Sequence, residues 1–389
     1  MSIAFIDLQA QRERIQTEID TAMQAVMAHG QFIMGPEVRD FEAKLADFGQ
    51  AKHALSCANG TDALALALMA WGLRTGDAVF CPSFTFVATG EVIPWLGAHP
   101  VFVDIDPVTY NMDPVHLEAS IAAVLAEGKL KPKAVIAVDL FGQPADYPAI
   151  SAIARKHGLK LIADSAQGFG CTIDDHHPLH WADITCTSFF PAKPLGCYGD
   201  GGAVLTNDHA LAELIDSLRI HGKATETDKA GATFDHDPKY WTMRIGMNSR
   251  LDTLQAAVLI EKLAIFSDEI DRRNAIARRY NAALAPHVAK VPVFADGQVS
   301  NWAQYTVEHD DRDGLIAHLR SQGVPSAVYY PMPIHTQAAY ARFSCGPGGL
   351  PHTEAAAGRV VSLPMHPYLD EATQDRIIAA VVGFQGVIQ

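Results

Sequence analysis

The chain has 389 residues, of which 49% are apolar, and a formal net charge of −14. A chain of this length and composition can bury a large core and is long enough for two domains. The acidic balance argues against nucleic acid or an anionic membrane surface as the main partner.

The N-terminus and the cysteines indicate the compartment. The first residues turn polar too soon for a signal peptide, and no apolar run reaches about 18 residues. We therefore expect a cytoplasmic protein without a membrane span. The six cysteines form no Cys-x-x-Cys pair, which favours buried, reduced thiols over disulfides or zinc ligands.

Apolar periodicity predicts two helices, followed by an alternation of strands and helices. Ile15, Ile19 and Val26 recur at helical spacing before Gly30, and a second amphipathic pattern runs from Val38 to Phe48. The alternation is typical of a mostly parallel sheet with helices on both faces. The expected strands are 78–81, 101–104, 134–139, 160–163, 184–189 and 201–207, and the expected helices include one ending near Trp95, 147–157 and 209–220.

A tight turn, Asn59-Gly60-Thr61-Asp62, follows an apolar segment and precedes an alanine-leucine helix. Free N–H groups at a helix start bind phosphate, and the Thr61 hydroxyl offers a further donor. The turn is a weak signal alone, because many α/β proteins have such turns without a ligand and Thr61 can be a simple N-cap.

Asp164 stands at the end of the apolar segment Leu159-Lys-Leu-Ile-Ala. Ligands of open α/β sheets lie at the C-terminal ends of the strands. An aspartate there can keep the ring nitrogen of a pyridine-based cofactor protonated, so that the ring acts as an electron sink. The alternative is a helix N-cap or a turn residue.

Lys193 is the only charged residue between Asp183 and Asp200. Loss of water lowers the pKa of a lysine and makes the neutral amine, a nucleophile toward aldehydes, accessible. The segment therefore indicates a lysine that bonds covalently to an aldehyde. The alternative is a lysine that reaches from a strand end to the surface.

Five segments, taken in order and spacing, resemble one family. They are Asn59-Gly-Thr-Asp-Ala-Leu, Pro82-Ser-Phe-Thr-Phe-Val-Ala-Thr, Asp164-Ser-Ala-Gln, Ser188-Phe-Phe-Pro-Ala-Lys and Gly246-Met-Asn-Ser-Arg-Leu-Asp. They are similar to the DegT/DnrJ/EryC1/StrS family of pyridoxal-phosphate (PLP)-dependent nucleotide-sugar aminotransferases over nearly the whole chain. The run from Phe189 to Gly202 most resembles the branch that aminates UDP-2-acetamido-2-deoxy-3-oxo-glucuronate in O-antigen synthesis.

The resemblance implies the α/β architecture of PLP-dependent transferase fold type I, the aspartate aminotransferase-like fold. Residues 1–255 would form a large PLP-binding domain with an N-terminal helical segment and a mixed, mostly parallel sheet. Residues 256–389 would form a small α+β domain, entered through a long helix that starts near Leu254.

The resemblance also implies the catalytic and cofactor-binding residues. Lys193 would bond the cofactor and move a proton between the sugar carbon and the cofactor, and Asp164 would pair with the pyridinium nitrogen. The remaining cofactor contacts would be Gln167 at the phenolic oxygen, Phe84 on the ring face, and Gly60, Thr61, Ser188 and an Asn248 from the neighbouring subunit at the phosphate.

Three of these positions have a purely structural alternative. Phe84 can be a core residue, Ser188 a strand-end hydroxyl and Asn248 a turn former. The asparagine from a neighbouring subunit implies a homodimer with shared active sites.

The resemblance implies two substrates, L-glutamate and a nucleotide sugar, and ping-pong kinetics. Because a UDP-sugar is negatively charged, local basic groups must overcome the acidic balance of the chain. Arg250 and His335 are our candidates for binding a substrate carboxylate, since an arginine offers a planar fork that matches this group.

Two polar segments remain. The stretch 222–244 is longer than in the branch compared, which leaves the sugar open, and it either contacts substrate or is a surface excursion. The segment Asp174-Asp-His-His-Pro-Leu-His has several potential metal ligands, but its residues are also typical of a hairpin turn. We expect no metal site.

Other functions stay open at this point. A dTDP-3-keto-6-deoxy or UDP-4-keto-6-deoxy sugar could be the acceptor, because the fold and the cofactor site do not fix the sugar. Related dehydratases have histidine in place of the lysine, so Lys193 argues against that branch. A non-catalytic PLP-binding regulator would need a DNA-binding module or a lost lysine, and the sequence shows neither.

Overall fold

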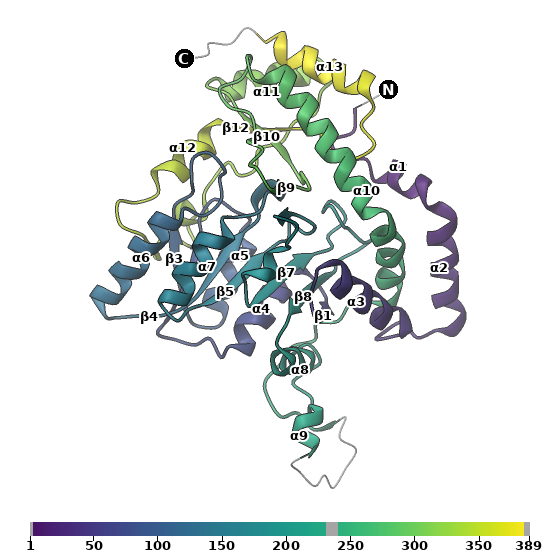
Figure 1. The fold of residues 1–389 in the computed structure, drawn as a ribbon, viewed down its shortest axis with the longest axis vertical. Helices are drawn as coiled ribbons and strands as arrows, with labels where there is room; N and C mark the ends of the chain where they lie inside the picture. The colour runs from purple at the N-terminus through teal and green to yellow at the C-terminus, as the bar shows by residue number, and fades with distance from the viewer. Residues whose placement is uncertain (1–2, 231–239, 385–389) are drawn as a thin grey trace.

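An eight-stranded sheet forms the centre of the computed structural model, which describes residues 3–230 and 240–384 (Figure 1). Across the sheet the strands are β1 (His53–Cys57), β8 (Gly202–Thr206), β7 (Ile184–Ser188), β5 (Lys160–Asp164), β4 (Lys131–Val138), β2 (Asp77–Pro82), β3 (His99–Val103) and β11 (Ser344–Cys345). Only β8 runs antiparallel to its neighbours within this described sheet. The predicted mixed, mostly parallel sheet is confirmed.

Helices cover both faces of the sheet. Alternate residues of β5 show the two faces, since Ile162 belongs to one core cluster and Leu161 and Ala163 belong to another. The helices in the first cluster are α4 (Gly60–Ala70), α5 (Ala88–Trp95) and α8 (His209–Leu218), and those in the second are α6 (Pro114–Glu127) and α7 (Tyr147–Lys156).

Helix α6 was missing from the predicted alternation. Its buried residues Leu117, Ile121 and Val124 do recur at helical spacing, and Asp113 caps its first turn by accepting a hydrogen bond from the Val115 amide (2.8 Å). The sequence therefore contains the periodic signal of this helix.

The N-terminal helices are α1 (Leu8–Arg14), α2 (Gln16–His29) and α3 (Pro36–Phe48). Gly30 ends α2 in the left-handed conformation, with a φ of 71°, and its N–H bonds the carbonyl oxygen of Val26. This confirms the predicted glycine cap. Helices α2 and α3 pack against the long helix α10 (Thr253–Leu284), which Figure 1 shows running from the large sheet to the C-terminal elements.

A second, smaller core surrounds the antiparallel pair β10 (Tyr305–Glu308) and β12 (Val360–Leu363). Helices α11 (Arg312–Ser321) and α13 (Glu371–Val382) pack there with the C-terminal half of α10. The chain then also returns to the large sheet, because Ile334 and Leu350 belong to its core and β11 pairs with β3. The division at residues 255 and 256 stays a prediction, since α10 contributes to both cores.

The segment after β6 (Thr172–Ile173) forms a hairpin turn, which the sequence predicted as the alternative to a metal site. Ile173 and His176 exchange two backbone hydrogen bonds (3.0 and 2.9 Å), and Asp174 and Asp175 have φ values of 48° and 63°. Strand β9 (Gln298–Val299) pairs with β6. In the described residues, no group of three or more His, Cys, Asp or Glu side chains is placed to hold a metal ion.

The polar stretch 222–244 is described only at its two ends, because residues 231–239 lie outside the described residues. Helix α9 (Glu226–Ala230) stands at one end, and Arg244 at the other end binds Asp228 through two hydrogen bonds (2.6 and 2.9 Å). The two predicted roles of this stretch, substrate contact and surface excursion, stay predictions. Over the described ranges, no helix has the length and apolar character that crossing a membrane requires.

Candidate active site

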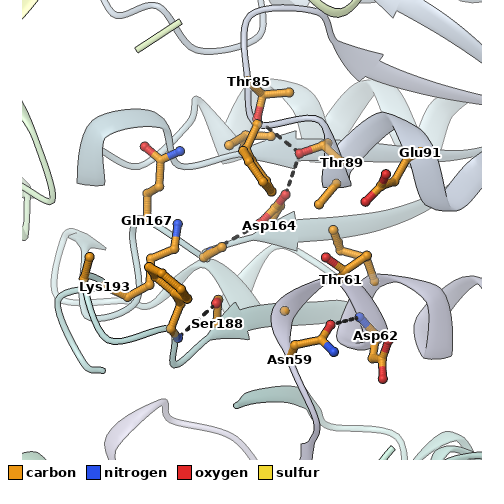
Figure 2. A pocket seen from close by; sticks show the side chains of 18 of the residues that line it. Asn59, Thr61, Asp62, Thr85, Thr89, Glu91, Asp164, Gln167, Ser188 and Lys193 are labelled. Atoms are coloured by element: carbon orange, nitrogen blue, oxygen red, sulfur yellow. Dashed lines mark hydrogen bonds between the residues drawn. The ribbon is translucent and has the colours of Figure 1, made fainter. Parts of the chain in front are cut away.

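A cavity of about 670 Å³ lies at the C-terminal ends of β5 and β7, beside the start of α4. Asp164 is the last residue of β5, and Ser188 is the last residue of β7. Figure 2 shows these two side chains together with Lys193, Gln167 and Thr61 around one space. Residues separated by more than a hundred positions in the sequence therefore meet where the parallel strands end.

The start of α4 forms one wall of this cavity. The Asn59 side chain accepts a hydrogen bond from the Asp62 amide (2.8 Å) and caps the helix. The amides of Gly60 and Thr61 precede the first helical hydrogen bonds, so they are available to an anion at the positive end of the helix.

Glycine allows this wall to approach the strands closely. A Cβ atom on Gly60 would lie 2.6 Å from Cβ of Ser188, and one on Gly202 would lie 2.4 Å from the backbone of Asn59. The backbone amides of α4 and the hydroxyl of Ser188 thus line a narrow cup with donors on two sides. The cup fits a phosphate group.

Asp164 is almost fully buried and partly satisfied by hydrogen bonds. Its Oδ2 accepts a hydrogen bond from the Thr89 hydroxyl (2.8 Å), and its Oδ1 accepts one from the Ala166 amide (3.2 Å). Burial raises the pKa of this carboxyl, and the two hydrogen bonds and Lys193 oppose the increase. A protonated ring nitrogen in the cavity would favour the ionised form and remove the cost of its burial.

Lys193 lines the cavity and is partly exposed to it, and its backbone amide bonds the carbonyl oxygen of Phe190 (2.8 Å). Burial lowers the pKa of the Lys193 amine, and the carboxylate of Asp164 opposes this decrease. The side chain is therefore held in surroundings that favour the neutral nucleophile, as the sequence predicted, and it does not extend along the outer surface.

Gln167 also lines the cavity, and both ends of its amide are held. Oε1 accepts a hydrogen bond from the Phe141 amide (2.9 Å), and Nε2 donates one to the hydroxyl of Tyr330 (3.0 Å). These contacts fix the orientation of the amide. Nε2 then has its second hydrogen for an oxygen of a bound ring.

The stacking role predicted for Phe84 is corrected by the structure. Phe84 is fully buried among Tyr110, Phe141 and Tyr330 and does not line the cavity. Phe86, two residues further along, lines the cavity with 52% of its surface exposed. The sequence does not distinguish the two residues, because a buried and a cavity-facing phenylalanine look the same in the pattern.

His335, predicted to bind a substrate carboxylate, does not line the cavity. Nδ1 of His335 lies 2.8 Å from the hydroxyl of Ser83, and Nε2 lies 3.2 Å from a carboxylate oxygen of Glu354. The ring is largely buried and outside the cavity lining. Both ring nitrogens are thus used to hold the segment that brings Tyr329 and Tyr330 to the cavity.

Asn248 and Arg250 lie outside the lining of this cavity. Asn248 is exposed and forms a backbone bridge with Ile220, and Arg250 is partly exposed. Between them, the hydroxyl of Ser249 accepts a hydrogen bond from the Ala58 amide (3.1 Å), which ties the segment to the end of β1.

Sequence reasoning missed several residues of the lining. Thr89 orients Asp164 and in turn contacts the hydroxyl of Thr85 (3.1 Å), as Figure 2 shows. Glu91 presents a carboxyl whose pKa is raised by partial burial. Thr89 and Glu91 both lie on α5, and Thr89 is the last residue of the quoted Pro82–Thr89 motif, so this motif contained part of the signal.

Comparisons with known proteins agree with these features. A model of the DegT/DnrJ/EryC1/StrS aminotransferase family matches residues 13–382. The chain belongs to this family. It is 48% identical over 379 residues to a UDP-2-acetamido-2-deoxy-3-oxo-D-glucuronate aminotransferase of Pseudomonas aeruginosa, with 97% of this chain and 99% of the relative covered.

Solved structures are similar over the full length. A DegT/DnrJ/EryC1/StrS aminotransferase from Brucella abortus is 52% identical, with a TM-score of 0.94 and coverage of 99% of this chain and 100% of that chain. A Bacillus subtilis protein with bound pyridoxamine phosphate is 28% identical, with a TM-score of 0.83 and coverage of 98% and 84%. The chain is therefore a PLP-dependent sugar aminotransferase with fold type I.

Proposed function

We propose that this enzyme transfers the amino group of L-glutamate to UDP-2-acetamido-2-deoxy-3-oxo-glucuronate during the synthesis of a surface polysaccharide such as O-antigen. The observation that carries the proposal is 48% identity, over 97% of the chain, to an aminotransferase for that sugar nucleotide. We place the reaction in the cytoplasm, and the six free cysteines support a reducing compartment.

The proposed roles of the cavity residues follow from their surroundings. Bound PLP supplies an aldehyde and a ring that withdraws electrons from the reacting carbon. Asp164, at the base of the cavity, would hold the ring nitrogen in its protonated form. The α4 amides and Ser188 would bind the phosphate, and Phe86 would pack on the ring face.

Lys193 would act twice in each half-reaction. In the first half-reaction its neutral amine would hold the cofactor covalently until L-glutamate displaces it, and it would then move a proton from the glutamate carbon to the cofactor. In the second half-reaction the free amine would move a proton from the cofactor to the sugar carbon and would then displace the amino sugar and bond the cofactor again. Its lowered pKa suits this role, because an amine that is protonated at working pH cannot accept a proton.

A homodimer with shared sites would supply the missing positive charge. Four acidic residues line the described cavity, and Lys193 is the only basic residue that lines it, although the proposed substrate carries a diphosphate and a carboxylate. We propose that Asn248 and Arg250 of one subunit reach the cavity of the other, since they lie two residues apart and away from their own cavity. Arg250 would bind the sugar carboxylate. The four acidic residues are Asp62, Glu91, Asp164 and Asp200.

The sugar is tested by offering keto-sugar nucleotides to enzyme that has been converted to its amino form with L-glutamate. We expect UDP-2-acetamido-2-deoxy-3-oxo-glucuronate to reverse the spectral change fastest. A dTDP-3-keto-6-deoxy sugar and a UDP-4-keto-6-deoxy sugar serve as comparisons. A faster return with either of them would replace the proposed substrate but would leave the cavity assignments intact.

A further inference from the structure

Lys262 is a buried lysine of α10 outside the cavity. Only 1% of its surface is exposed, and its Nζ donates a hydrogen bond to the carbonyl oxygen of Gly196 (2.7 Å). The same Nζ lies 4.3 Å from the centre of the Tyr198 ring. Lysines are almost never fully buried unless they have a partner, because the ammonium group loses its water.

Both contacts of Lys262 are made to the loop that carries Lys193. This loop joins β7 to β8 and is tightly wound, since the amide of Lys193 bonds the carbonyl of Phe190 and the amide of Cys197 bonds the carbonyl of Phe189, both at 2.8 Å. A Cβ on Gly196 would lie 2.5 Å from the carbonyl oxygen of Pro191. The position of the Gly196 carbonyl is therefore closely coupled to that of Lys193, three residues earlier.

Helix α10 holds the loop at a second point on the same face. The side chain of Gln255 accepts a hydrogen bond from the Tyr198 amide (2.8 Å). Gln255 and Lys262 are seven residues apart, which is two helical turns, so both side chains point toward the loop. Helix α10 thus contacts the segment from Gly196 to Tyr198 through two side chains, neither of which lines the cavity.

A buried charge costs stability, and an apolar residue of similar size would avoid this cost. Burial lowers the pKa of Lys262 to about 8, while Glu269 and Cys197 oppose the decrease. The hydrogen bond from Lys262 to the Gly196 carbonyl explains why a charged residue is present at this position. A charge-assisted hydrogen bond holds a carbonyl group in place more firmly than apolar packing does.

We propose that Lys262 is a positioning residue that fixes the loop behind Lys193 and thereby sets the place of the Lys193 amine in the cavity. The inference rests on the proposed role of Lys193 toward PLP and does not depend on which sugar is aminated. It assigns Lys262 no contact with cofactor or substrate.

The test replaces Lys262 by methionine and compares it with a matched control, Arg273→Met. Arg273 is also a buried cation of α10 that donates to a carbonyl, that of Trp302 (3.1 Å), but it lies at the small core and away from the loop. Amide hydrogen exchange of the segment 189–198 is measured on cofactor-free and PLP-loaded protein. Borohydride labelling of Lys193 by PLP is timed in parallel.

For Lys262→Met we expect exchange of the loop to become roughly tenfold faster and labelling of Lys193 to slow by a similar factor, because one charged hydrogen bond is lost. Exchange in the small core should stay unchanged. Arg273→Met should leave the loop and the labelling rate as in the wild type.

A folded Lys262→Met protein with wild-type loop exchange and wild-type labelling would overturn the proposal. If this variant does not fold, Lys262→Gln, whose side chain is one bond too short to reach Gly196, is measured with the same two outcomes. Neither measurement uses a sugar, so failure of the proposed substrate would be seen separately. Labelling on a lysine other than Lys193 would instead contradict the proposed role of that residue.

Discussion

At the scale of single residues, burial shifts the pKa values of two titratable groups of the cavity in opposite directions. The pKa of Lys193 is lowered and that of Asp164 is raised, because protein atoms replace water around both. Each shift favours the uncharged form. The lowered pKa favours the nucleophilic amine of Lys193, whereas a cation such as a pyridinium would favour the ionised carboxylate of Asp164.

Asp164→Asn should separate stability from activity. The pKa of an unfolded aspartate is near 4, and the folded value is raised, so the folded state binds the proton more tightly. Ionisation of Asp164 therefore costs stability as the pH rises above about 4. We expect cofactor-free Asp164→Asn to be at least as heat-stable as the wild type at pH 8. At pH 5 we expect a smaller gain in Tm over the wild type.

Turnover of the same variant with PLP should fall by ~10² or more, because the charge opposite the ring is lost. The measurements are thermal unfolding of the cofactor-free protein at the two pH values and steady-state kinetics of the loaded enzyme. Wild-type turnover in Asp164→Asn would contradict the role that we assign to the carboxylate.

Phe84 and Phe86 should respond differently to replacement by alanine. Phe84→Ala removes a fully buried ring and should cost about 3–5 kcal/mol of folding free energy. Phe86→Ala removes a half-exposed ring from the cavity and should leave stability almost unchanged while it weakens PLP binding by roughly tenfold. Denaturant unfolding measures the change in folding free energy, and PLP titration measures the change in binding. If Phe84→Ala weakened PLP binding and Phe86→Ala did not, the stacking role predicted for Phe84 from the sequence would be correct.

At the scale of elements, the cavity depends on the close approach of α4 to β7 and β8. The positive end of a helix acts over a short range, so the first amides of α4 must lie next to the ligand. Gly60 and Gly202 permit this approach, because a side chain at either position would meet the neighbouring segment. The turn sequence thus has a packing role in addition to its hydrogen-bonding role.

Gly60→Ala should weaken both PLP binding and the fold. Its new Cβ would meet Ser188 at 2.6 Å, and such overpacking costs about 1–3 kcal/mol. Gly358→Ala, in α12 (Pro351–Arg359), is the control, because a Cβ there meets nothing within 4 Å and alanine favours a helix. We expect a lower Tm and weaker PLP binding only for Gly60→Ala, and a normal PLP affinity in this variant would show that the cup tolerates a wider spacing.

At the scale of the whole molecule, the acidic chain must bind an acidic substrate. The net charge is −14, and the charge of the described cavity lining is itself mainly negative. The proposed site shared between two copies would resolve this conflict, because the second copy would bring basic groups that one chain does not place in its own cavity. We expect Arg250 of one copy to reach the cavity of the other copy.

Mixing two inactive variants tests the shared site. We expect Lys193→Ala and Arg250→Ala each to lose nearly all activity on the uronate sugar as homodimers. When they are co-expressed, half of the dimers combine the two chains, and one of their two cavities has both Lys193 and an intact Arg250 from the other copy. Activity should then return to about a quarter of the wild-type value.

If Arg250 served its own subunit, no mixed dimer would have a complete cavity, and co-expression would restore nothing. That result would overturn the shared site. A wild-type rate in the Arg250→Ala homodimer would remove Arg250 from substrate binding altogether.

The strands and most helices could be predicted, since apolar periodicity reports which side of an element faces the core. Asp164 and Ser188 could be placed at strand ends for the same reason. Phe84 could not be placed correctly, because the sequence does not show whether a ring faces the cavity or the core. The raised pKa of Glu91 was also hidden, since it arises from burial that several distant segments create.

Local motifs and hydrophobic spacing were sufficient to predict the family, the mostly parallel sheet and the lysine that we propose to react with the cofactor. The tertiary structure alone decided which side chains line the cavity and that α10 supports the loop of Lys193. The physical reason is that pKa shifts, close glycine contacts and buried hydrogen bonds arise between segments that are distant in the sequence and meet only in the folded chain.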